Sequence, residues 1–336
     1  MQTRYKVAIV GATGVVGRTV LKVLEEKSFY NCSYVLFSSK KSAGNKIEFL
    51  GQNYIIQELT DTSFTNIKFD FAIFCAGGKV SEKYAPIAAS TGCIVIDNSS
   101  VFRMNEKVPL VVPEVNPEEI LKNRGIIANP NCSTIQAVVV LKPLDDAYKI
   151  KRIVYSTYQA VSGAGLKALN DYKNGIKKHL NPLHKYDLEK FDYDIFDNCI
   201  PQIDTFEDNL YTKEEMKMIN ETRKILNKPD LNITATAVRV PVNNCHGESI
   251  NIEFENTFYL RDVIDILSTS IGVKVLNTPH YPMPINVSGY NDVFVGRIRR
   301  DNSIKNGLNL WVVADNIRKG AATNAVQILK DLICLK

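Results

Sequence analysis

The sequence contains no apolar run long enough to span a bilayer, no low-complexity tract and no short-period repeat. Its first ten residues, MQTRYKVAIV, enter a strand-like run almost at once and contain neither the apolar stretch nor the cleavage site of a signal peptide. We therefore expect a cytoplasmic protein without a membrane partner. The 336 residues, 45% hydrophobic and 23% charged, suit a globular chain of two domains.

Cysteine is present, but in no pattern typical of a metal site or a disulfide framework. The seven cysteines are odd in number, form no CxxC pair and show no zinc-type spacing. Cys245-His246 has no second ligand pair at a usual spacing, so we expect no metal. The net charge of +5, from 41 basic and 36 acidic residues, is modest and unclustered. It favours small anionic ligands over nucleic acid.

The first third of the chain alternates apolar strand-like runs with segments of helical periodicity. Buried strands that alternate with helices imply a parallel, doubly wound sheet. The expected strands are Lys6–Val10, Tyr34–Phe37, Phe69–Cys75 and Cys93–Ile96, and the expected helices are Val15–Lys27 and Val80–Thr91.

From about residue 150 the strands become longer, and several alternate apolar with polar residues as a half-exposed mixed or antiparallel sheet does. Asn181–Tyr211 is irregular and predicts a surface excursion, and Gly320–Leu332 predicts a helix that returns to the first domain. The expected strands are Ile150–Val161, Ile233–Val242, Ser249–Glu255, Val293–Arg299 and Leu308–Ala314, and the expected helices are Gly165–His179, Lys213–Leu226 and Leu260–Ser270.

A glycine-rich turn, Gly11-Ala-Thr-Gly14-Val-Val-Gly17, follows the first strand and opens the first helix. Glycines allow a tight turn and a close approach of backbone to pyrophosphate, and the helix N-terminus supplies N–H donors. The spacing is GxxGxxG, so it is the strand–turn–helix context that predicts a dinucleotide site. The alternative is a glycine turn that serves helix packing alone.

The end of the second strand indicates which dinucleotide binds. NAD enzymes usually place an acid there to accept from the ribose 2′-hydroxyl. The segment Phe37-Ser-Ser-Lys-Lys-Ser-Ala-Gly44 has none, and its hydroxyls and lysines favour a 2′-phosphate and therefore NADP. The alternative is that Lys40 and Lys41 belong to a solvated loop. Ala76 and Gly77, after another strand, predict a second approach to the cofactor.

The segment Asn129-Pro-Asn-Cys-Ser-Thr134 places Cys132 where an extended segment turns into a helix, because apolar residues follow at helical spacing. A thiol there faces unpaired N–H groups and the positive end of the helix dipole, which stabilise the nucleophilic thiolate. The alternative is a buried core cysteine, the common fate of a free cysteine.

These motifs together resemble the aspartate-β-semialdehyde dehydrogenase family, in the family's order and over nearly the whole chain. The Asn-Cys-Ser-Thr and Ser-Gly-Ala-Gly blocks are the specific ones. The matching segments are Gly11–Gly17, Ser38–Gly44, Ala76–Gly78, Asn98–Ser100, Asn129–Thr134, Gln159–Gly165, Ile200–Asp204, Glu214–Lys217, Arg239–Pro241, His246 and Lys319–Gln327.

The resemblance implies a role for each matching position. Cys132 corresponds to the nucleophile that forms an acyl-enzyme, His246 to the general acid–base and Gln159 to the residue that orients the intermediate. Arg239 corresponds to the clamp on the substrate α-carboxylate and Glu214 to the partner of its amino group. The implied phosphate contacts are Arg103, Asn131 and Lys217, and the implied cofactor contacts are Gly11, Thr13, Gly14, Val15, Val16, Ser38, Ser39, Lys41, Ser42, Ala76, Gly77, Ser162, Gly163, Gly165 and Asn324.

The implied fold is α/β: a Rossmann-type NADP-binding domain of residues 1–128, completed by a C-terminal helix at 315–336, and an α+β mixed-sheet catalytic and dimerisation domain of residues 129–314. The implied assembly is a homodimer or a homotetramer. Two positions depart from the family pattern. Lys41 stands where arginine is usual, giving a point charge in place of a bidentate fork, and Cys75 stands where serine is usual.

The implied reaction is the reversible NADPH-dependent reductive dephosphorylation of L-4-aspartyl phosphate to L-aspartate-4-semialdehyde, in the pathway to lysine, methionine, threonine and isoleucine. A thiolate suits it, because sulfur attacks the acyl carbon, phosphate departs and a thioester remains. One alternative is N-acetyl-γ-glutamyl-phosphate reductase, whose N-acylated substrate needs no partner such as Glu214. Another is an NADP-binding sensor without turnover.

Overall fold

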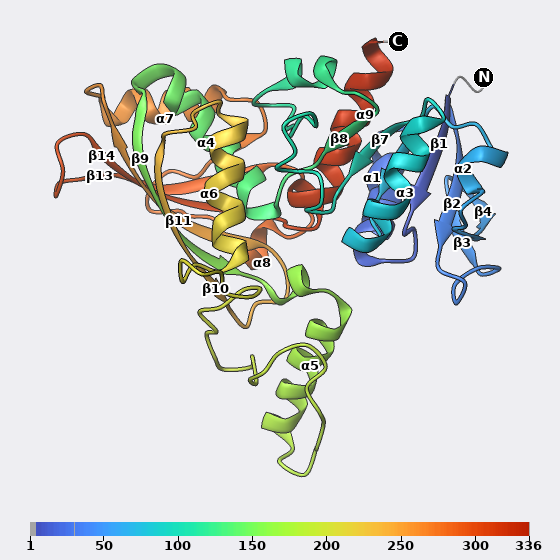
Figure 1. The fold of residues 1–336 in the computed structure, drawn as a ribbon. Coiled ribbons are helices and arrows are strands. Elements are labelled where there is room, and N and C mark those ends of the chain that lie inside the picture. Colours follow the sequence, from blue (N-terminus) through green and yellow to red (C-terminus); the bar gives the residue numbers. More distant parts are fainter. Residues whose placement is uncertain (1–4, 30, 336) are drawn as a thin grey trace. The chain divides into compact units, whose positions relative to one another are not determined.

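The computed structural model describes residues 5–29 and 31–335 (Figure 1). It divides into two compact units. Unit 1 contains residues 1–131 and 321–336, and unit 2 contains residues 132–320. Both boundaries lie a few residues beyond those expected from the sequence. Among the described residues, no helix combines the length and the apolar character needed to cross a membrane.

Unit 1 is built on a six-stranded sheet whose strands pair in parallel, in the order β5-β2-β1-β6-β7-β8. This is the parallel, doubly wound arrangement expected from the sequence. The strands are β1 (Tyr5–Val10), β2 (Cys32–Ser38), β5 (Gln57–Glu58), β6 (Phe71–Phe74), β7 (Ile94–Asp97) and β8 (Ile126–Ala128), and the helices are α1 (Val15–Glu26), α2 (Ser63–Asn66), α3 (Gly78–Ser90), the short 3-10 helix at Pro117–Lys122, and α9 (Asn324–Leu335).

Successive side chains of β1 point to opposite faces of this sheet and enter two separate apolar clusters. Val7 and Ile9 belong to the cluster that also holds Leu24 of α1 and Leu329 of α9. Ala8 and Val10 belong to the other cluster, with residues of α3. The C-terminal helix therefore completes the core of unit 1. A hairpin of β3 (Lys46–Phe49) and β4 (Gln52–Ile55), absent from the sequence expectation, follows β2.

Unit 2 is built on a mixed six-stranded sheet, sheet C, in the order β10-β9-β11-β14-β13-β12. Only its outermost pairs, β10–β9 and β12–β13, are parallel. The strands are β9 (Ile150–Gln159), β10 (Asn232–Arg239), β11 (His246–Phe254), β12 (Val273–Val275), β13 (Val293–Asp301) and β14 (Gly307–Ala314), and the helices are α4 (Cys132–Tyr148), α5 (Leu166–Leu180), α6 (Lys213–Ile225), α7 (Leu260–Thr269) and α8 (Pro284–Val287).

Helices α4, α6 and α7 pack on one face of sheet C, which we call the covered face (Figure 1). Residues 133–141 of α4 are all buried, because the helix lies between the sheet and both other helices. Apolar side chains around most of its circumference fit that position. On β11 the even-numbered residues from His246 to Phe254 are buried and form part of the covered face.

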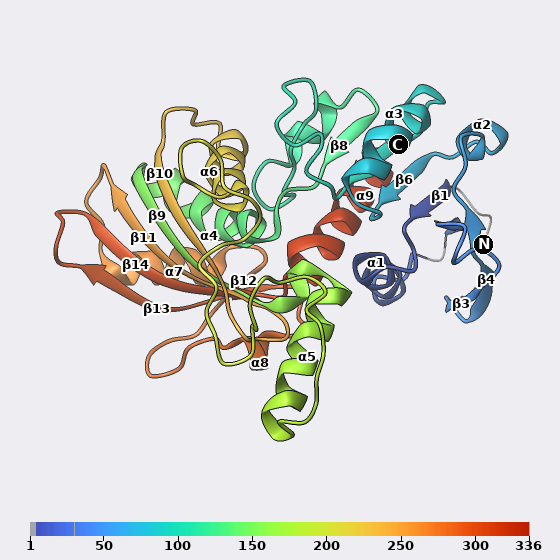
Figure 2. The same cartoon turned by 60° about the horizontal axis from the view of Figure 1, so that its bottom comes forward.

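Helix α5 and the segment after it extend away from sheet C (Figure 2). Residues 181–211 contain only isolated bridges, as expected of an irregular excursion. The buried carboxylate of Asp171 accepts backbone N–H groups from Glu189, Lys190 and Phe191. This one side chain therefore ties the excursion back to α5.

Candidate active site

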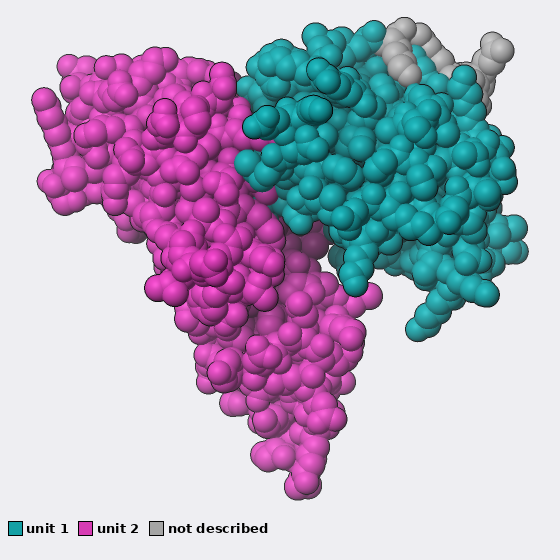
Figure 3. Space-filling view, viewed as in Figure 1, with its two compact units in different colours: residues 1–131, 321–336 teal, residues 132–320 magenta. Residues whose placement is uncertain are grey.

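The site residues expected from the sequence divide between the two units, which Figure 3 shows in different colours. In unit 1 the turn after β1 admits only glycine at two positions. Gly11 has φ +85°, and a Cβ there would lie 2.8 Å from the backbone carbon of Cys75. A Cβ on Gly17 would lie 2.2 Å from the carbonyl oxygen of Gly11. Backbone N–H groups at the start of α1 can therefore approach a pyrophosphate closely.

The end of β2 lies against this turn. The hydroxyls of Thr13 and Ser38 are 2.7 Å apart, and this contact links the glycine turn to the last residue of β2. Ser39 and Lys41 are exposed, and Ser42 is half-buried. This combination of hydroxyls and a lysine fits a ribose 2′-phosphate. Gly14, Val15 and Val16 are half-buried at the helix start, and Ala76 and the positive-φ residue Gly77 lead from β6 into α3.

Beyond β7 and β8, unit 1 contains a hydrogen-bonded group of buried polar side chains. Arg103, only 7% exposed, donates from Nε to the carbonyl of Asn129 at 2.9 Å and from Nη2 to that of Asn98 at 3.0 Å. Asn324, at the start of α9, donates to Oδ1 of Asn129 at 2.7 Å. Arg103 and Asn324 are thus held by the same loop, and Asn131 is buried two residues further along.

Cys132 is the first residue of α4, as expected. Its side chain is partly exposed, and its thiol lies at the positive end of that helix. Gly320 packs directly against it, since a Cβ on Gly320 would lie 2.7 Å from Cβ of Cys132. Cys132 also interacts electrostatically with Arg239. These surroundings favour a thiolate over a thiol.

Three strands deliver the polar side chains that share the covered face. Gln159 ends β9, Arg239 ends β10, and the two are direct register partners. His246 begins β11, one residue before the pairing of Gly247 with Tyr158. The strand expected to begin at Ser249 begins three residues earlier, so the predicted boundary was wrong and His246 is a strand residue. The turn itself ends at Cys245, which has a φ of +72°.

His246 is fully buried and has a defined tautomer. The backbone N–H of Ala160 donates to Nδ1 at 3.0 Å, so the neutral ring carries its proton on Nε2. Burial, and then the charge of Arg239, hold the pKa of His246 well below its ordinary value of 6.5. The ring is therefore neutral near pH 7 and presents Nε2–H as a hydrogen-bond donor.

Arg239 is 5% exposed and is held by the same backbone unit. Its Nη1 donates to the carbonyl of Ala160 at 2.7 Å. Burial lowers the pKa of the guanidinium, and Glu214 and Cys132 oppose that shift. Gly163 packs closely against both side chains, because a Cβ there would lie 3.2 Å from Arg239 Nη1 and from His246 Nε2. Ala160 thus fixes the arginine and the histidine at once.

Helix α6 contributes an acidic side chain, Glu214, and a basic side chain, Lys217. Its N-terminus is fixed by a capping box between Thr212 and Glu215. Glu214, 6% exposed, accepts from Gln159 Nε2 at 3.3 Å and from Lys217 Nζ at 3.3 Å. Lys217 also donates to Asp204 of the excursion at 2.9 Å. Glu214 and Lys217 are three residues apart and share a helix face, and the acid points inward toward Gln159.

The turn after β9 holds the remaining expected cofactor contacts, Ser162, Gly163 and Gly165. Asn316 anchors it, because the side chains of Asn316 and Ser162 are hydrogen-bonded at 3.1 Å. The same Asn316 accepts the N–H of Cys245 at 2.9 Å. Sequence reasoning missed Asn316, although the motif that runs from residue 319 follows it closely.

Sequence reasoning also missed Glu248, a fully buried carboxyl group two residues beyond His246. The available signal was parity: a strand that starts at His246 puts 246, 248, 250 and 252 on one face, and an acid in that apolar row is unusual. The described residues contain no group of three or more His, Cys, Asp or Glu side chains arranged to hold a metal ion.

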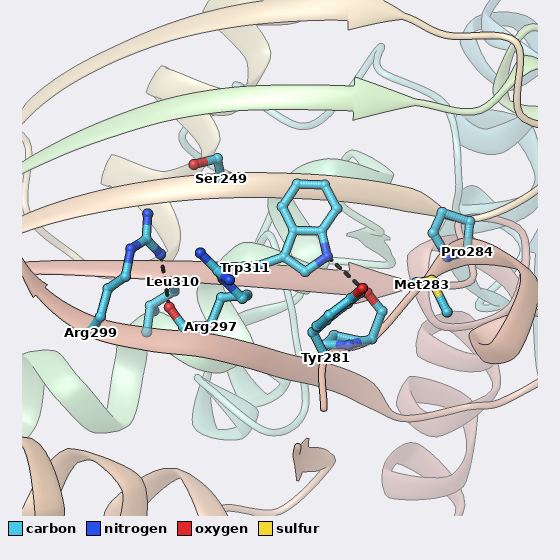
Figure 4. A pocket seen from close by; sticks show the side chains of 9 residues that line it. Ser249, Tyr281, Met283, Pro284, Arg297, Arg299, Leu310 and Trp311 are labelled. Atoms are coloured by element: carbon cyan, nitrogen blue, oxygen red, sulfur yellow. Dashed lines mark hydrogen bonds between the residues drawn. The ribbon is translucent and has the colours of Figure 1, made fainter. Parts of the chain in front are cut away.

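The opposite face of sheet C, which we call the open face, carries a cavity of about 420 Å³ (Figure 4). None of the site residues expected from the sequence lines it. Trp311 lies at its centre, with Nε1 donating to the carbonyl of Pro282 at 2.9 Å. Arg297 and Arg299 of β13 stand on one side and Tyr281 on the other. The cavity is therefore separate from the chemistry of the covered face.

Comparison with known proteins identifies the family. The family model "Semialdehyde dehydrogenase, NAD binding domain" matches residues 6–123, and "Semialdehyde dehydrogenase, dimerisation domain" matches residues 141–319. The chain is 52% identical to an aspartate-semialdehyde dehydrogenase of Aquifex aeolicus, over 98% of both chains.

Solved structures agree with this match. The crystal structure of aspartate semialdehyde dehydrogenase II from Vibrio cholerae, complexed with ASA, has a TM-score of 0.96 and 46% identity over 99% of both chains. That of the Candida albicans enzyme with NADP has a TM-score of 0.75 and 26% identity over 98% of both chains. The chain therefore belongs to the aspartate-semialdehyde dehydrogenase family.

Proposed function

We propose that this protein catalyses the reversible, NADP-dependent conversion of L-4-aspartyl phosphate to L-aspartate-4-semialdehyde and phosphate. The observation that carries the proposal is Cys132 at the start of α4, in the same unit as a covered face that presents Gln159, Arg239 and His246. Full-length relatives bear the name of this activity, and one is solved with ASA. The same reaction gives the chain its place in the synthesis of lysine, methionine, threonine and isoleucine.

The Cys132 thiolate attacks the acyl carbon, the carbon–oxygen bond to phosphate breaks, and a thioester forms. His246 presents Nε2–H as a donor to the oxygen that gains negative charge, and Gln159 orients the acyl group. When bound, NADPH supplies the hydride that brings the thioester carbon to the aldehyde level. The Cys132 thiolate is then the leaving group. His246 cannot accept a proton at Nε2 while Ala160 donates to Nδ1, so it acts first as a donor.

The substrate ends are assigned to charged groups. Arg239 is placed to clamp the α-carboxylate, for which a guanidinium provides bidentate geometry. Glu214 is placed to accept from the α-amino group, because its carboxylate is buried beside Gln159. Lys217 in unit 2, and Arg103 and Asn131 in unit 1, are the proposed phosphate contacts. A buried acid opposite the amino group argues against an N-acylated substrate, and therefore against N-acetyl-γ-glutamyl-phosphate reductase.

The residues of unit 1 fit NADP. The glycine turn with Thr13 would hold the pyrophosphate, Ser38, Ser39, Lys41 and Ser42 the 2′-phosphate, and Ala76, Gly77 and Asn324 further parts of the dinucleotide. In unit 2 the turn of Ser162, Gly163 and Gly165 is proposed to face the nicotinamide. The NAD-binding family match and the solved NADP complex of a relative support this cofactor.

The direct test is phosphate-dependent reduction of NADP⁺ by L-aspartate-β-semialdehyde, followed by NADPH absorbance, with NAD⁺ and Cys132→Ala alongside. Turnover with NADP⁺ that disappears in the variant supports substrate, cofactor and nucleophile together. Activity only with N-acetyl-glutamate semialdehyde would contradict the substrate. Cofactor binding with no turnover on either aldehyde, unchanged in the variant, would point to a sensor.

We further propose that the protein is a homodimer paired through the open face of sheet C. The dimerisation-domain match covers these strands, and Tyr158, with 44% of its surface exposed, lies there beside Trp311. Tyr158→Glu should halve the mass measured by light scattering, from twice the 37.7 kDa mass of one chain to that mass. The control Tyr259→Glu changes a more exposed tyrosine just before α7 and should leave the mass unchanged. A fourfold mass in the parent would instead show that dimers pair into tetramers.

A further inference from the structure

Glu248 is a buried carboxyl group to which the proposed chemistry gives no task. Its side chain is 0% exposed, and neither carboxyl oxygen has a hydrogen-bond partner among the described residues. Burial raises its pKa well above the ordinary 4.5, the nearby Ser133 hydroxyl opposes the shift, and Glu214 reinforces it. An unpaired carboxylate is strongly disfavoured in such surroundings, so the neutral carboxylic acid is the favoured form of the group.

The strand places Glu248 inside the covered face. It lies two residues from His246 and therefore points to the same side of β11. Its register partner on β9 is Thr157, whose hydroxyl accepts from Gln159 Nε2 at 3.4 Å. Glu248 therefore lies on the same face as His246 of its own strand, and it lies beside Thr157 and Gln159 of β9.

Helix α4 approaches the same strand with two polar side chains of one face. Ser133 and Gln136 are three residues apart, so they lie on the same side of the helix. Gln136 Nε2 donates to the carbonyl of His246 at 3.3 Å, and Ser133 lies against the carboxyl of Glu248. Two polar contacts, one turn apart, therefore set the first turn of α4 on β11. Cys132 immediately precedes Ser133.

The other groups around Glu248 leave it no cationic partner in unit 2. The titratable groups that face it are Glu214 on α6, Tyr155 on β9 and His246 on its own strand. On the β14 side its register partner is Val312, which is apolar. A negative charge here would oppose the thiolate of Cys132, whereas a neutral acid can still donate and accept hydrogen bonds.

We propose that Glu248, as a neutral carboxylic acid, is a positioning residue that holds the first turn of α4 against β11 and so sets Cys132 relative to His246 and Gln159. This inference rests on the proposed function for its catalytic meaning. Its structural content does not, because the orientation and reactivity of the Cys132 thiol can be measured without turnover.

Three variants separate the hydrogen-bonding capacity of the side chain from its volume and from a general loss of packing. Glu248→Gln keeps a neutral hydrogen-bond donor and acceptor in the same shape. Glu248→Leu fills a similar volume with an apolar side chain. Ile250→Ala is the control, since Ile250 is a fully buried residue of the same face one step further along β11. The readouts are kcat and both KM values, and the alkylation rate of Cys132 by iodoacetamide against pH, measured on its own peptide by mass spectrometry in the cofactor-free protein.

Glu248→Leu should lower kcat about 100-fold, as a misplaced nucleophile does, with KM values within a few-fold of the parent, and should slow Cys132 alkylation. Glu248→Gln should restore both rates to within about threefold, because its amide keeps the shape and the hydrogen-bonding capacity of a neutral acid beside Ser133. Ile250→Ala should lower the melting temperature and leave both rates near the parent. Normal rates in Glu248→Leu, or equal defects in the Gln and Leu variants, would overturn the proposal.

If Glu248→Leu does not fold, melting temperatures of Glu248→Gln decide the question. A raised folded-state pKa means that the folded parent binds more protons than the unfolded chain above pH 4.5. The parent therefore loses stability as pH rises from that value, and Glu248→Gln does not. The melting advantage of Glu248→Gln should grow with pH, and a constant difference would show a charged Glu248. A parent without turnover would contradict the proposed function and leave the alkylation and melting results valid.

Discussion

Units 1 and 2 present their site residues in different ways. In unit 1 most of the proposed dinucleotide contacts lie in the turns after β1, β2 and β6, where Gly11 approaches Cys75 and the side chains of Ser39 and Lys41 are exposed. In unit 2 the proposed substrate contacts Gln159, Arg239 and His246 lie on the covered face, and Glu214 lies on α6 beside it. All four are at most 6% exposed.

The difference reflects what each unit has to recognise. A dinucleotide phosphate is bound by N–H groups and exposed cations that need no unusual protonation state. A reacting acyl group needs polar side chains held in one geometry and shielded from water, where their electrostatic effect is strongest. Substitutions in unit 1 should therefore lower mainly the affinity for the cofactor, and substitutions in unit 2 should lower mainly turnover.

The largest effect should come from Cys132→Ser. Removal of the nucleophilic sulfur should lower turnover by about 10⁴-fold or more, because the thioester cannot form. NADPH affinity, measured by fluorescence titration, should stay within a few-fold of the parent, because the dinucleotide turn belongs to unit 1. A matching loss of cofactor affinity would remove the distinction between the units.

The converse substitution, Gly11→Ala, should damage unit 1 alone. The new Cβ would lie 2.8 Å from backbone at a φ of +85°, so the turn must shift. The dissociation constant for NADPH should rise about tenfold or more, since the backbone donors of the turn move with it. Cys132 alkylation in the cofactor-free protein should keep the parent's rate. Ala43→Gly, on the neighbouring loop, is the control for a general loosening of unit 1.

A smaller effect concerns pH and the buried histidine. Because the pKa of His246 is lowered in the folded state, the unfolded chain binds more protons below pH 6.5. The parent should therefore lose stability as pH falls below that value, and His246→Asn should lose less. Thermal unfolding across a pH series measures this. Melting curves that run parallel through the acid range would show that His246 titrates normally.

The smallest effect should come from Asp204→Asn. Lys217 is shared between Glu214 and Asp204, and Asp204 is the more exposed of the two acids. Loss of its charge should leave Lys217 more available to phosphate and lower the KM for phosphate about threefold, within the range of exposed ion pairs. The KM for the aldehyde should not change. Asp208→Asn, in the same excursion, is the charge-matched control.

The elements that sequence predicted best are those whose pattern is local. The buried strands and α1 of unit 1 agree with the structure to within a few residues, and so do α5, α6 and α7. The start of α4 at Cys132 was predicted from the apolar spacing that follows it. The hairpin β3–β4 was missed, because its strands are four residues long and mostly exposed, so they carry little apolar signal.

The candidate site was predicted position by position from the family resemblance, and its arrangement was not. The spacing of Glu214 and Lys217 indicated a shared helix face, but not that the acid turns inward to Gln159. The boundary of β11 was placed three residues late, which hid the shared parity of His246 and Glu248. A strand start in a polar turn has no periodic signal of its own.

The sequence by itself determined the two-domain α/β organisation, the glycine turn for a dinucleotide, the absence of an acid at the end of β2 and the position of Cys132 at a helix start. The last three follow from residue types within one short segment, and the first follows from the chain length and the order of its strands and helices. Only the tertiary structure decided that the N–H and the carbonyl of Ala160 fix His246 and Arg239, and that Glu248 lies against Ser133. Those contacts join segments up to 115 residues apart, so burial and protonation there depend on how the strands and helices pack.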